Sequence, residues 1–182
     1  MAMTRLRRQT LRGLALLLLA PALAFAQQPG EYEVKAAFVH NIAKFVEWPA
    51  PSSDGNAIQL CILGRNPFGD ALAVLDGKQV GKLSWKISFP TIQSNLRACQ
   101  VLFIAASEGG RLVPIFDKLG DAPTLTMGDT EGFAELGVMV NFYIDENKVR
   151  FELNSEAASR ARLKFSSQLL KLARIVKPRR AN

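Results

Sequence analysis

Apolar residues along the chain follow two spacings, which predict strands that alternate with helices. Residues 58–63 and 101–106 are nearly continuous apolar runs, typical of parallel strands covered on both faces. Residues 31–48 and 112–119 instead place apolar side chains along one face of a helix. This alternation predicts an α/β fold: a single domain with a mostly parallel twisted sheet flanked by helices.

The last third of the chain has a different pattern. Residues 138–144 and 148–153 are predicted strands joined by Asp145-Glu146-Asn147, which fits a C-terminal antiparallel hairpin. Asn154 is placed to cap a final helical region. We expect this region to break at residues 160–164 and to resume as a helix over residues 168–176.

Shorter elements are predicted between the main strands. Residues 83–89 alternate between apolar and polar side chains, which predicts a half-exposed strand near a sheet edge. A helix is expected over residues 67–75, and the connection over residues 90–96 is also expected to be helical. His40 lies away from the apolar stripe of the first helix, so we expect it at the surface or on the flank of that helix.

The first 26 residues differ from the rest in composition. Four arginines precede the apolar run 14–20, and Ala24-Phe25-Ala26 is a small-x-small cleavage site. This pattern predicts a signal peptide cleaved after Ala26. The alternative, a membrane anchor, is short for a span of about 20 residues and contains Pro21. We therefore expect an exported domain over residues 27–176, followed by a basic tail over residues 177–182.

The charge of the chain belongs largely to its two ends. The formal net charge of +7 falls to +3 without the leader, because 19 basic and 16 acidic residues remain. The basic tail is expected to be solvated, so nucleic acid is not an expected partner.

The two cysteines, Cys61 and Cys99, are expected to form a disulfide, because exported proteins meet an oxidising compartment. Two buried free thiols are the alternative.

Motifs for catalysis are incomplete. Gly64 and Gly69 have the spacing of a phosphate-binding loop, but Asp70 and Ala71 follow where Lys and Ser or Thr are required. A tight turn is the simpler interpretation, although Arg65 could accompany an anion there. A single histidine and two cysteines that pair supply no metal site, and no cofactor is expected.

Catalysis is therefore not expected, although an exported hydrolase remains a hypothesis. Ser107 follows a predicted strand, but the chain has no Gly-x-Ser-x-Gly motif. A small-ligand crevice at the strand carboxyl ends, near Gly64, Ser107 and Asp129, is another hypothesis. Aromatic side chains beside predicted turns could anchor a protein partner or could simply close the core: Trp48, Phe68, Trp85, Phe133 and Tyr143.

Several short motifs, in this order and spacing, resemble the YfiR family of periplasmic proteins. The resemblance runs from about Glu31 to Val176, nearly all of the expected mature chain. The motifs are Val34-Lys35-Ala36-Ala37-Phe38 with Phe45 and Trp48-Pro49; Cys61-Ile62-Leu63-Gly64 with Pro67-Phe68-Gly69; Cys99 before Val101-Leu102-Phe103-Ile104; Gly132-Phe133; Val149-Arg150-Phe151 with Asn154; and Ser167, Leu169-Leu170 and Leu172-Ala173.

The resemblance implies a periplasmic regulator without enzymatic activity. The best-known member of the family dimerises and represses a membrane-bound diguanylate cyclase by binding its periplasmic sensor domain, and an outer-membrane lipoprotein can capture it. By resemblance we expect a homodimer that represses a cyclase or sensor kinase of the inner membrane. Cys61 and Cys99 match one cysteine pair of the family, and the second pair is absent from this chain.

Overall fold

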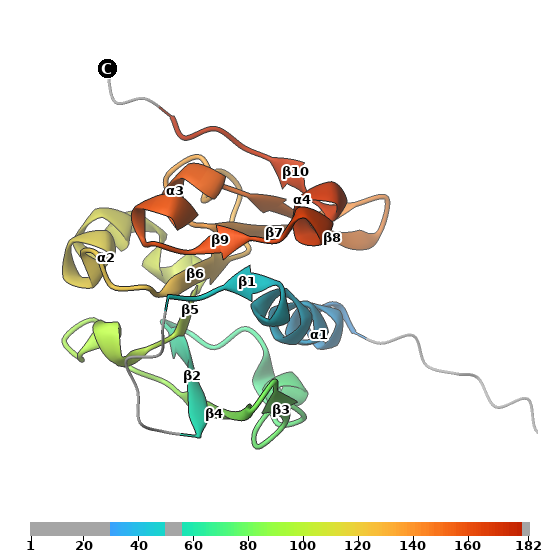
Figure 1. The fold of residues 1–182 in the computed structure, drawn as a ribbon, viewed down its shortest axis with the longest axis vertical. Helices are drawn as coiled ribbons and strands as arrows, with labels where there is room; N and C mark the ends of the chain where they lie inside the picture. Colours follow the sequence, from blue (N-terminus) through green and yellow to red (C-terminus); the bar gives the residue numbers. More distant parts are fainter. Residues whose placement is uncertain (1–29, 50–55, 180–182) are drawn as a thin grey trace, which may run out of the picture.

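The computed structural model describes residues 30–49 and 56–179 (Figure 1). The predicted signal peptide, residues 51–55 of a predicted loop and the end of the basic tail lie outside the described residues. The helices are α1 (Glu31–Lys44), α2 (Leu112–Leu119), α3 (Ser155–Arg160) and α4 (Ser167–Leu172), and the 3-10 helices are η1 (Gly69–Leu72), η2 (Leu96–Ala98) and η3 (Ala106–Arg111).

The main sheet of the described chain has eight strands in the order β10-β8-β7-β6-β5-β2-β4-β3, and β1 pairs separately with β9. The β7–β8 and β3–β4 pairs are antiparallel, and the other pairs of the main sheet are parallel. This arrangement confirms the predicted fold class. The strands are β1 (Val46–Glu47), β2 (Ala57–Leu63), β3 (Gln79–Val80), β4 (Leu83–Ser88), β5 (Val101–Ile104), β6 (Leu125–Gly128), β7 (Val140–Asp145), β8 (Lys148–Leu153), β9 (Lys164–Phe165) and β10 (Arg174–Ile175).

Both faces of the main sheet are covered, which explains why its central strands are apolar throughout. Ile58, Leu60 and Ile62 of β2 belong to one core, together with residues of α1, α3 and α4. Cys61 and Leu63 of the same strand belong to a second core, which is closed by α2 and η2. Successive side chains of a strand point to opposite faces, so β2 contributes to both cores.

The C-terminal hairpin has a tight two-residue turn. Glu146 and Asn147 have φ values of 47° and 59°, as the turn types that match strand twist require. Asn154 then caps α3, because its side-chain oxygen accepts a hydrogen bond from the Ala157 N–H at 2.9 Å. Arg162, with φ of 61°, interrupts the helical region, as expected.

The predicted helices at residues 67–75 and 90–96 are largely wrong, and the one at residues 168–176 is confirmed only in its first part. The first region contains only the short 3-10 helix η1, and the second ends where the 3-10 helix η2 begins. The positive φ of Gly69 (52°) is incompatible with continuing an α-helix. The last helix ends at Leu172, and the chain then extends as β10 along the free edge of β8. A sheet edge offers unpaired backbone groups, which this segment satisfies. Similarly, β3 pairs with β4, so β4 lies next to the edge.

The predicted apolar face of α1 is confirmed at Ile42, which is buried, but the buried face is wider than the sequence predicts and ends before Phe45. Phe45 is 39% exposed, whereas Ala36, Val39, His40 and Ala43 are buried. His40 is only 4% exposed, in contrast to its predicted surface position. The indole Nε1–H of Trp85 donates to His40 Nδ1 at 2.9 Å, and this bond joins α1 to β4. His40 can be buried on this face of α1 because the indole N–H of Trp85, on a distant strand, satisfies its ring nitrogen.

Acidification is expected to destabilise the fold through His40. Its Nδ1 accepts a hydrogen bond, so the imidazole is neutral, and burial together with the charges of Lys44 and Lys78 lowers its pKa below 6.5. The unfolded chain therefore binds a proton more readily. Stability from this residue is complete above about pH 6.5 and is lost as pH falls toward the folded pKa, by at most about 1.4 kcal/mol per pH unit.

Urea unfolding of the wild type and of H40Q between pH 7.5 and pH 5 tests this prediction. The Gln side chain can still accept from Trp85 but does not titrate in this range. The difference in unfolding free energy between the two proteins should shrink on acidification, and a constant difference would contradict the prediction.

Candidate functional site

Gly64 and Ser107 lie in contact at the carboxyl ends of β2 and β5, where the sequence predicts a crevice. Gly64 has φ of 95°, and a Cβ atom there would lie 2.5 Å from Ser107 Oγ. Ser107 Oγ accepts a hydrogen bond from the Arg65 N–H at 2.9 Å, while the Arg65 side chain is exposed. A side chain at position 64 would collide with Ser107, which explains why a glycine occupies this position. The serine hydroxyl therefore holds the β2 turn against the end of β5.

Asp129, at the same edge after β6, forms a buried ion pair. Lys35 Nζ lies 2.8 Å from Asp129 Oδ2, and the two side chains are 4% and 6% exposed. Tyr32 donates its hydroxyl hydrogen to the same oxygen at 2.9 Å. Burial disfavours the charge of Lys35, but its hydrogen bonds to Asp129 and Glu31 outweigh this cost and raise its pKa. Burial and the bond to Asp129 also raise the pKa of Tyr32.

Three of the predicted aromatic anchors instead close the core. Phe68, Trp85 and Phe133 are 4%, 2% and 3% exposed. The Phe68 ring packs edge-on against Phe103, with their centroids 4.7 Å apart. Partial exposure remains for Trp48 and Tyr143. At the carboxyl edge of the sheet, Ser107 and Asp129 are therefore engaged in contacts within the fold, and Phe133 is packed in the core.

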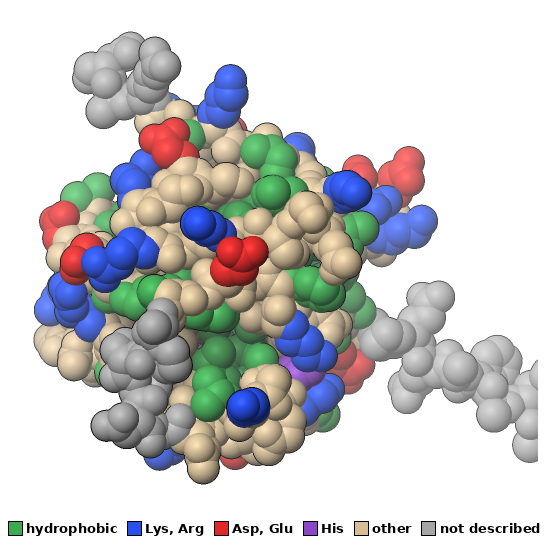
Figure 2. All heavy atoms as spheres, viewed as in Figure 1, with side chains coloured by type: hydrophobic (Ala, Val, Ile, Leu, Met, Phe, Trp, Pro, Cys, Tyr) green, Lys and Arg blue, Asp and Glu red, His purple; other side chains and the backbone are tan. Residues whose placement is uncertain are grey.

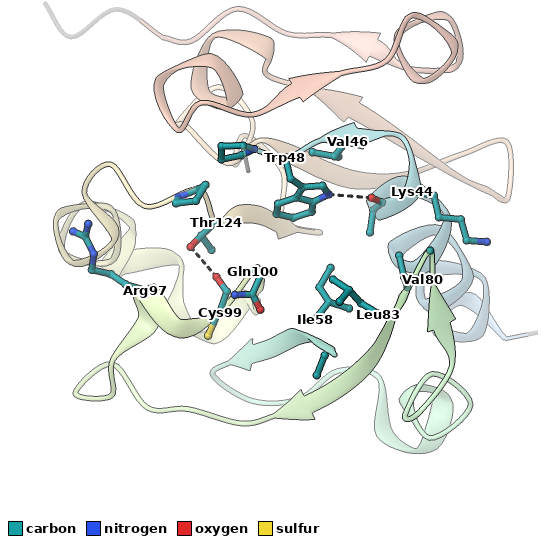
Figure 3. A pocket seen from close by; sticks show the side chains of 15 residues that line it. Lys44, Val46, Trp48, Ile58, Val80, Leu83, Arg97, Cys99, Gln100 and Thr124 are labelled. Atoms are coloured by element: carbon teal, nitrogen blue, oxygen red, sulfur yellow. Dashed lines mark hydrogen bonds between the residues drawn. The ribbon is translucent and has the colours of Figure 1, made fainter. Parts of the chain in front are cut away.

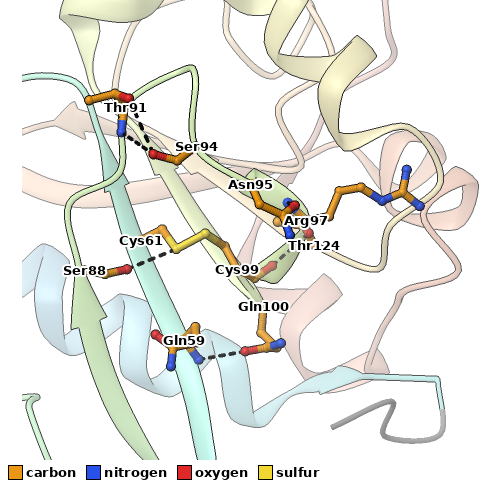
Figure 4. Close-up of a disulfide and its surroundings, with 10 residues drawn as sticks. All are labelled: Gln59, Cys61, Ser88, Thr91, Ser94, Asn95, Arg97, Cys99, Gln100 and Thr124. Carbon is orange, nitrogen blue, oxygen red and sulfur yellow. Dashed lines mark hydrogen bonds between the residues drawn. A yellow bond between two sulfur atoms is a disulfide. The ribbon is translucent and has the colours of Figure 1, made fainter.

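The predicted disulfide between Cys61 and Cys99 is present (Figure 4). It joins β2 to the end of η2, with a Cα–Cα distance of 5.8 Å. Two hydrogen bonds hold the same region: Gln59 N–H donates to Gln100 Oε1 at 2.8 Å, and the Thr124 hydroxyl donates to the Cys99 carbonyl at 2.8 Å. Together these contacts fix the segment that leads into β5.

A cavity of about 650 Å³ lies at the opposite, amino-terminal edge of the parallel strands. The end of α1 and β1 form one side, and the starts of β2, β4, β5 and β6 form the other (Figure 3). Hydrophobic side chains are recessed below β1 in the view of Figure 2. The lining residues are Ala43, Lys44, Val46, Trp48, Pro49, Ala57, Ile58, Val80, Gly81, Leu83, Arg97, Cys99, Gln100, Pro123 and Thr124.

Trp48 provides an apolar aromatic wall of this cavity. Its Nε1–H donates to the Ala43 carbonyl at 3.3 Å, which directs the polar edge of the indole toward α1. The ring lies opposite Ile58 and Leu83 across the cavity (Figure 3). The sequence predicts Trp48 as a candidate binding residue, but the cavity itself is visible only in the folded chain. No sequence signal links Trp48 to strand starts so far along the chain.

Over residues 30–49 and 56–179, no group of three or more His, Cys, Asp or Glu side chains is placed to hold a metal ion. No helix of this part of the chain is long and apolar enough to span a bilayer.

Comparisons with known proteins give one family and a general fold. A model of the YfiR/HmsC-like family matches residues 32–174. The crystal structure of a conserved domain protein from Vibrio cholerae O1 biovar El Tor str. N16961 is similar, with a TM-score of 0.56 and 11% identity, over 82% of this chain and 60% of that one.

A second similar structure is the ABC domain in complex with L-Trp from Streptococcus pneumoniae. Its TM-score is 0.52 at 8% identity, over 75% of this chain and 59% of that one. At these identities the likeness shows the fold alone. The chain spans about three fifths of the length of either structure, 60% and 59%.

Proposed function

Because this chain belongs to the YfiR/HmsC-like family, whose members are periplasmic regulators, we propose that it represses a membrane signalling protein by binding its periplasmic sensor domain. A diguanylate cyclase is the proposed partner, and a sensor kinase is the alternative. The family match over residues 32–174 carries this proposal, because it spans nearly the whole described domain. Repression by binding requires a complementary surface and no catalytic centre.

We propose that the partner binds at α4 and β10, which lie together at the edge of the sheet (Figure 1). Leu172 is 74% exposed and Ile175 is 52% exposed. Large apolar side chains on a sheet edge are suited to a protein interface, where they become buried. The backbone of β10 can additionally pair with a strand of the partner.

Charge around this surface favours an acidic partner. Arg174 is paired with Glu152, and the Arg174 guanidinium also lies over the Tyr143 ring, 4.4 Å from its centroid. Lys171 and Lys177 flank the two apolar residues without a carboxylate partner among the described ion pairs. A sensor domain with an apolar patch rimmed by Asp or Glu would complement them.

On the basis of the family match we also propose that the protein forms a homodimer, is captured by an outer-membrane lipoprotein and has no enzymatic activity. Light scattering of the purified protein tests the first of these, and a mass of one chain at micromolar concentration would contradict it.

Deletion of the gene is expected to raise cellular cyclic di-GMP, and complementation with the wild type should restore it. The double variant L172E/I175E should fail to restore it and should bind the purified sensor domain at least about tenfold more weakly. V113E is a matched control, because Val113 is 70% exposed on α2, away from this surface.

Two outcomes would contradict different parts of the proposal, namely repression of a cyclase and binding through the α4–β10 surface. Unchanged cyclic di-GMP after deletion would contradict repression of a cyclase. Full activity of L172E/I175E alongside a clear deletion phenotype would contradict only the α4–β10 surface.

A further inference from the structure

Glu152, on β8, is a buried carboxylate that pairs with Arg174 on the last strand, β10. The Glu152 side chain is 6% exposed, whereas the Arg174 side chain is 59% exposed. Arg174 Nε donates to Glu152 Oε2 at 3.0 Å, and its Nη2 donates to the same oxygen. The buried half of this ion pair therefore belongs to the interior of the sheet, and the exposed half belongs to the edge strand.

The surroundings of this carboxylate come from β7 and β8. Asn141, the β7 neighbour of Glu152 in the strand register, donates its side-chain amide to Glu152 Oε1 at 3.1 Å. The ring of Tyr143, also on β7, lies against the Arg174 guanidinium, with 4.4 Å between the ring centroid and Cζ. A carboxylate beside an aromatic face forms a receptor for a guanidinium group.

The strand that fills this receptor is weakly held. β10 pairs with β8 at two positions, and the Val176 N–H adds one bond to the Leu153 carbonyl at 2.9 Å. None of residues 171–179 is buried, and Ile175 is 52% exposed. A segment that buries so little apolar surface opens at low cost in free energy. Its opening frees the edge of β8, where another extended segment can form the same backbone bonds.

The buried charge restricts which segment can replace β10. With Arg174 removed, Glu152 would be a buried carboxylate without its cation, which is strongly unfavourable. An incoming strand is therefore accepted only if it brings a cation to the same position. Arginine fits better than lysine, because its planar group can donate to the carboxylate while it stacks on the Tyr143 ring.

We propose that the edge of β8, with Glu152, Asn141 and Tyr143, binds an extended, arginine-bearing segment of a protein partner other than the sensor domain. β10 is the occupant that this segment displaces. Displacement moves Ile175 away from the α4–β10 surface, so the two partners exclude each other. This last consequence rests on the proposed function, whereas the groove at β8 does not.

A synthetic peptide that copies residues 172–177, acetyl-Leu-Ala-Arg-Ile-Val-Lys-amide, tests the groove. Fluorescence anisotropy of the labelled peptide measures its affinity for the exported protein, and a peptide with citrulline in place of arginine is the uncharged control. R174A should bind the arginine peptide about tenfold or more tightly than the wild type does, because its receptor is not already occupied. The citrulline peptide should bind R174A about tenfold or more weakly than the arginine peptide.

Substitutions assign the binding to this edge of the sheet. The double variant R174A/E152Q should lose the preference for arginine over citrulline, because the Gln side chain carries no charge. R160A is the matched control, because Arg160 also pairs with a carboxylate, that of Glu156 at 2.9 Å, but both side chains are exposed on α3. R160A should bind the peptide as weakly as the wild type.

Hydrogen exchange of the wild type supplies a second test, which holds even if R174A fails to fold. The Val176 N–H should exchange about 100-fold or more faster than the amides that pair β7 with β8. An excess of the arginine peptide should accelerate this exchange further, because it displaces β10, and the citrulline peptide should not.

Three results would overturn the proposal: equal affinity of R174A and the wild type for the arginine peptide, equal affinity of R174A for the two peptides, or exchange at Val176 as slow as in β7 and β8. Dissociation of a wild-type dimer by the peptide would also overturn it, because the groove would then belong to a second copy of this chain. Failure of the sensor domain to bind at all would contradict the proposed function and would not change these peptide results.

Discussion

Replacing both Cys61 and Cys99 by alanine is expected to lower the free energy of unfolding by about 3–4 kcal/mol. The disulfide closes a loop with a sequence separation of 38 residues, which restricts the unfolded chain. Both cysteines are buried, each 3% exposed, and they tie β2 to the segment that enters β5. For a chain of this size the loss corresponds to a melting temperature lower by roughly 6–16 °C.

Urea and thermal unfolding of C61A/C99A measure this effect. The reduced wild type is the matched control, because it lacks the bond but retains both side chains. Dithiothreitol should bring the wild type close to the double variant and should leave the variant unchanged. A loss below about 1 kcal/mol in both comparisons would show that the bond does not restrict the unfolded chain as expected.

Breaking the ion pair between Lys35 and Asp129 is expected to cost about 3–5 kcal/mol. In K35M, Asp129 keeps the hydroxyl of Tyr32 as a partner but loses the only cation paired with it in the described structure. The carboxylate remains buried, so only the hydrogen bond from Tyr32 is left to compensate its desolvation. The pair also fastens α1 to the end of β6, residues that lie 94 positions apart in the sequence.

A double variant separates the cost of leaving Asp129 buried without its cation from the net contribution of the whole ion pair. K35M/D129N removes both charges, so it should recover a large part of the stability lost in K35M, as replacement of whole buried pairs often does. K44M removes an exposed lysine from the same helix and should change stability by less than about 0.5 kcal/mol. A similar small effect of K35M would contradict the role of the buried pair.

Elements with strong local signals were predicted correctly. The apolar runs of β2 and β5 indicate strands buried on both faces, and both lie in the middle of the sheet. The hairpin between β7 and β8 and the cap at Asn154 depend on neighbouring residues alone. The prediction of the disulfide depends also on the expected export of the chain, because the sequence gives no distance between Cys61 and Cys99.

The errors share a different cause, which is contact with distant parts of the chain. Residues 168–176 have the apolar spacing of a helix, but the free edge of β8 converts Arg174 and Ile175 into a strand. His40 turns inward because Trp85, 45 residues later, satisfies its ring nitrogen. Phe68 and Phe133 lie beside turns as predicted, yet both are buried by side chains from other elements.

The sequence by itself determined the family resemblance, the parallel α/β architecture and the main strands, because these follow from the order and periodicity of local patterns. Only the tertiary structure decided where a ligand could bind. Ser107 and Asp129 are engaged in holding the fold at the carboxyl edge. At the amino edge, Trp48, Ile58 and Leu83 meet around one cavity (Figure 3), although separate parts of the chain carry them. Such a meeting is set by how strands and helices pack, and no short stretch of sequence encodes it.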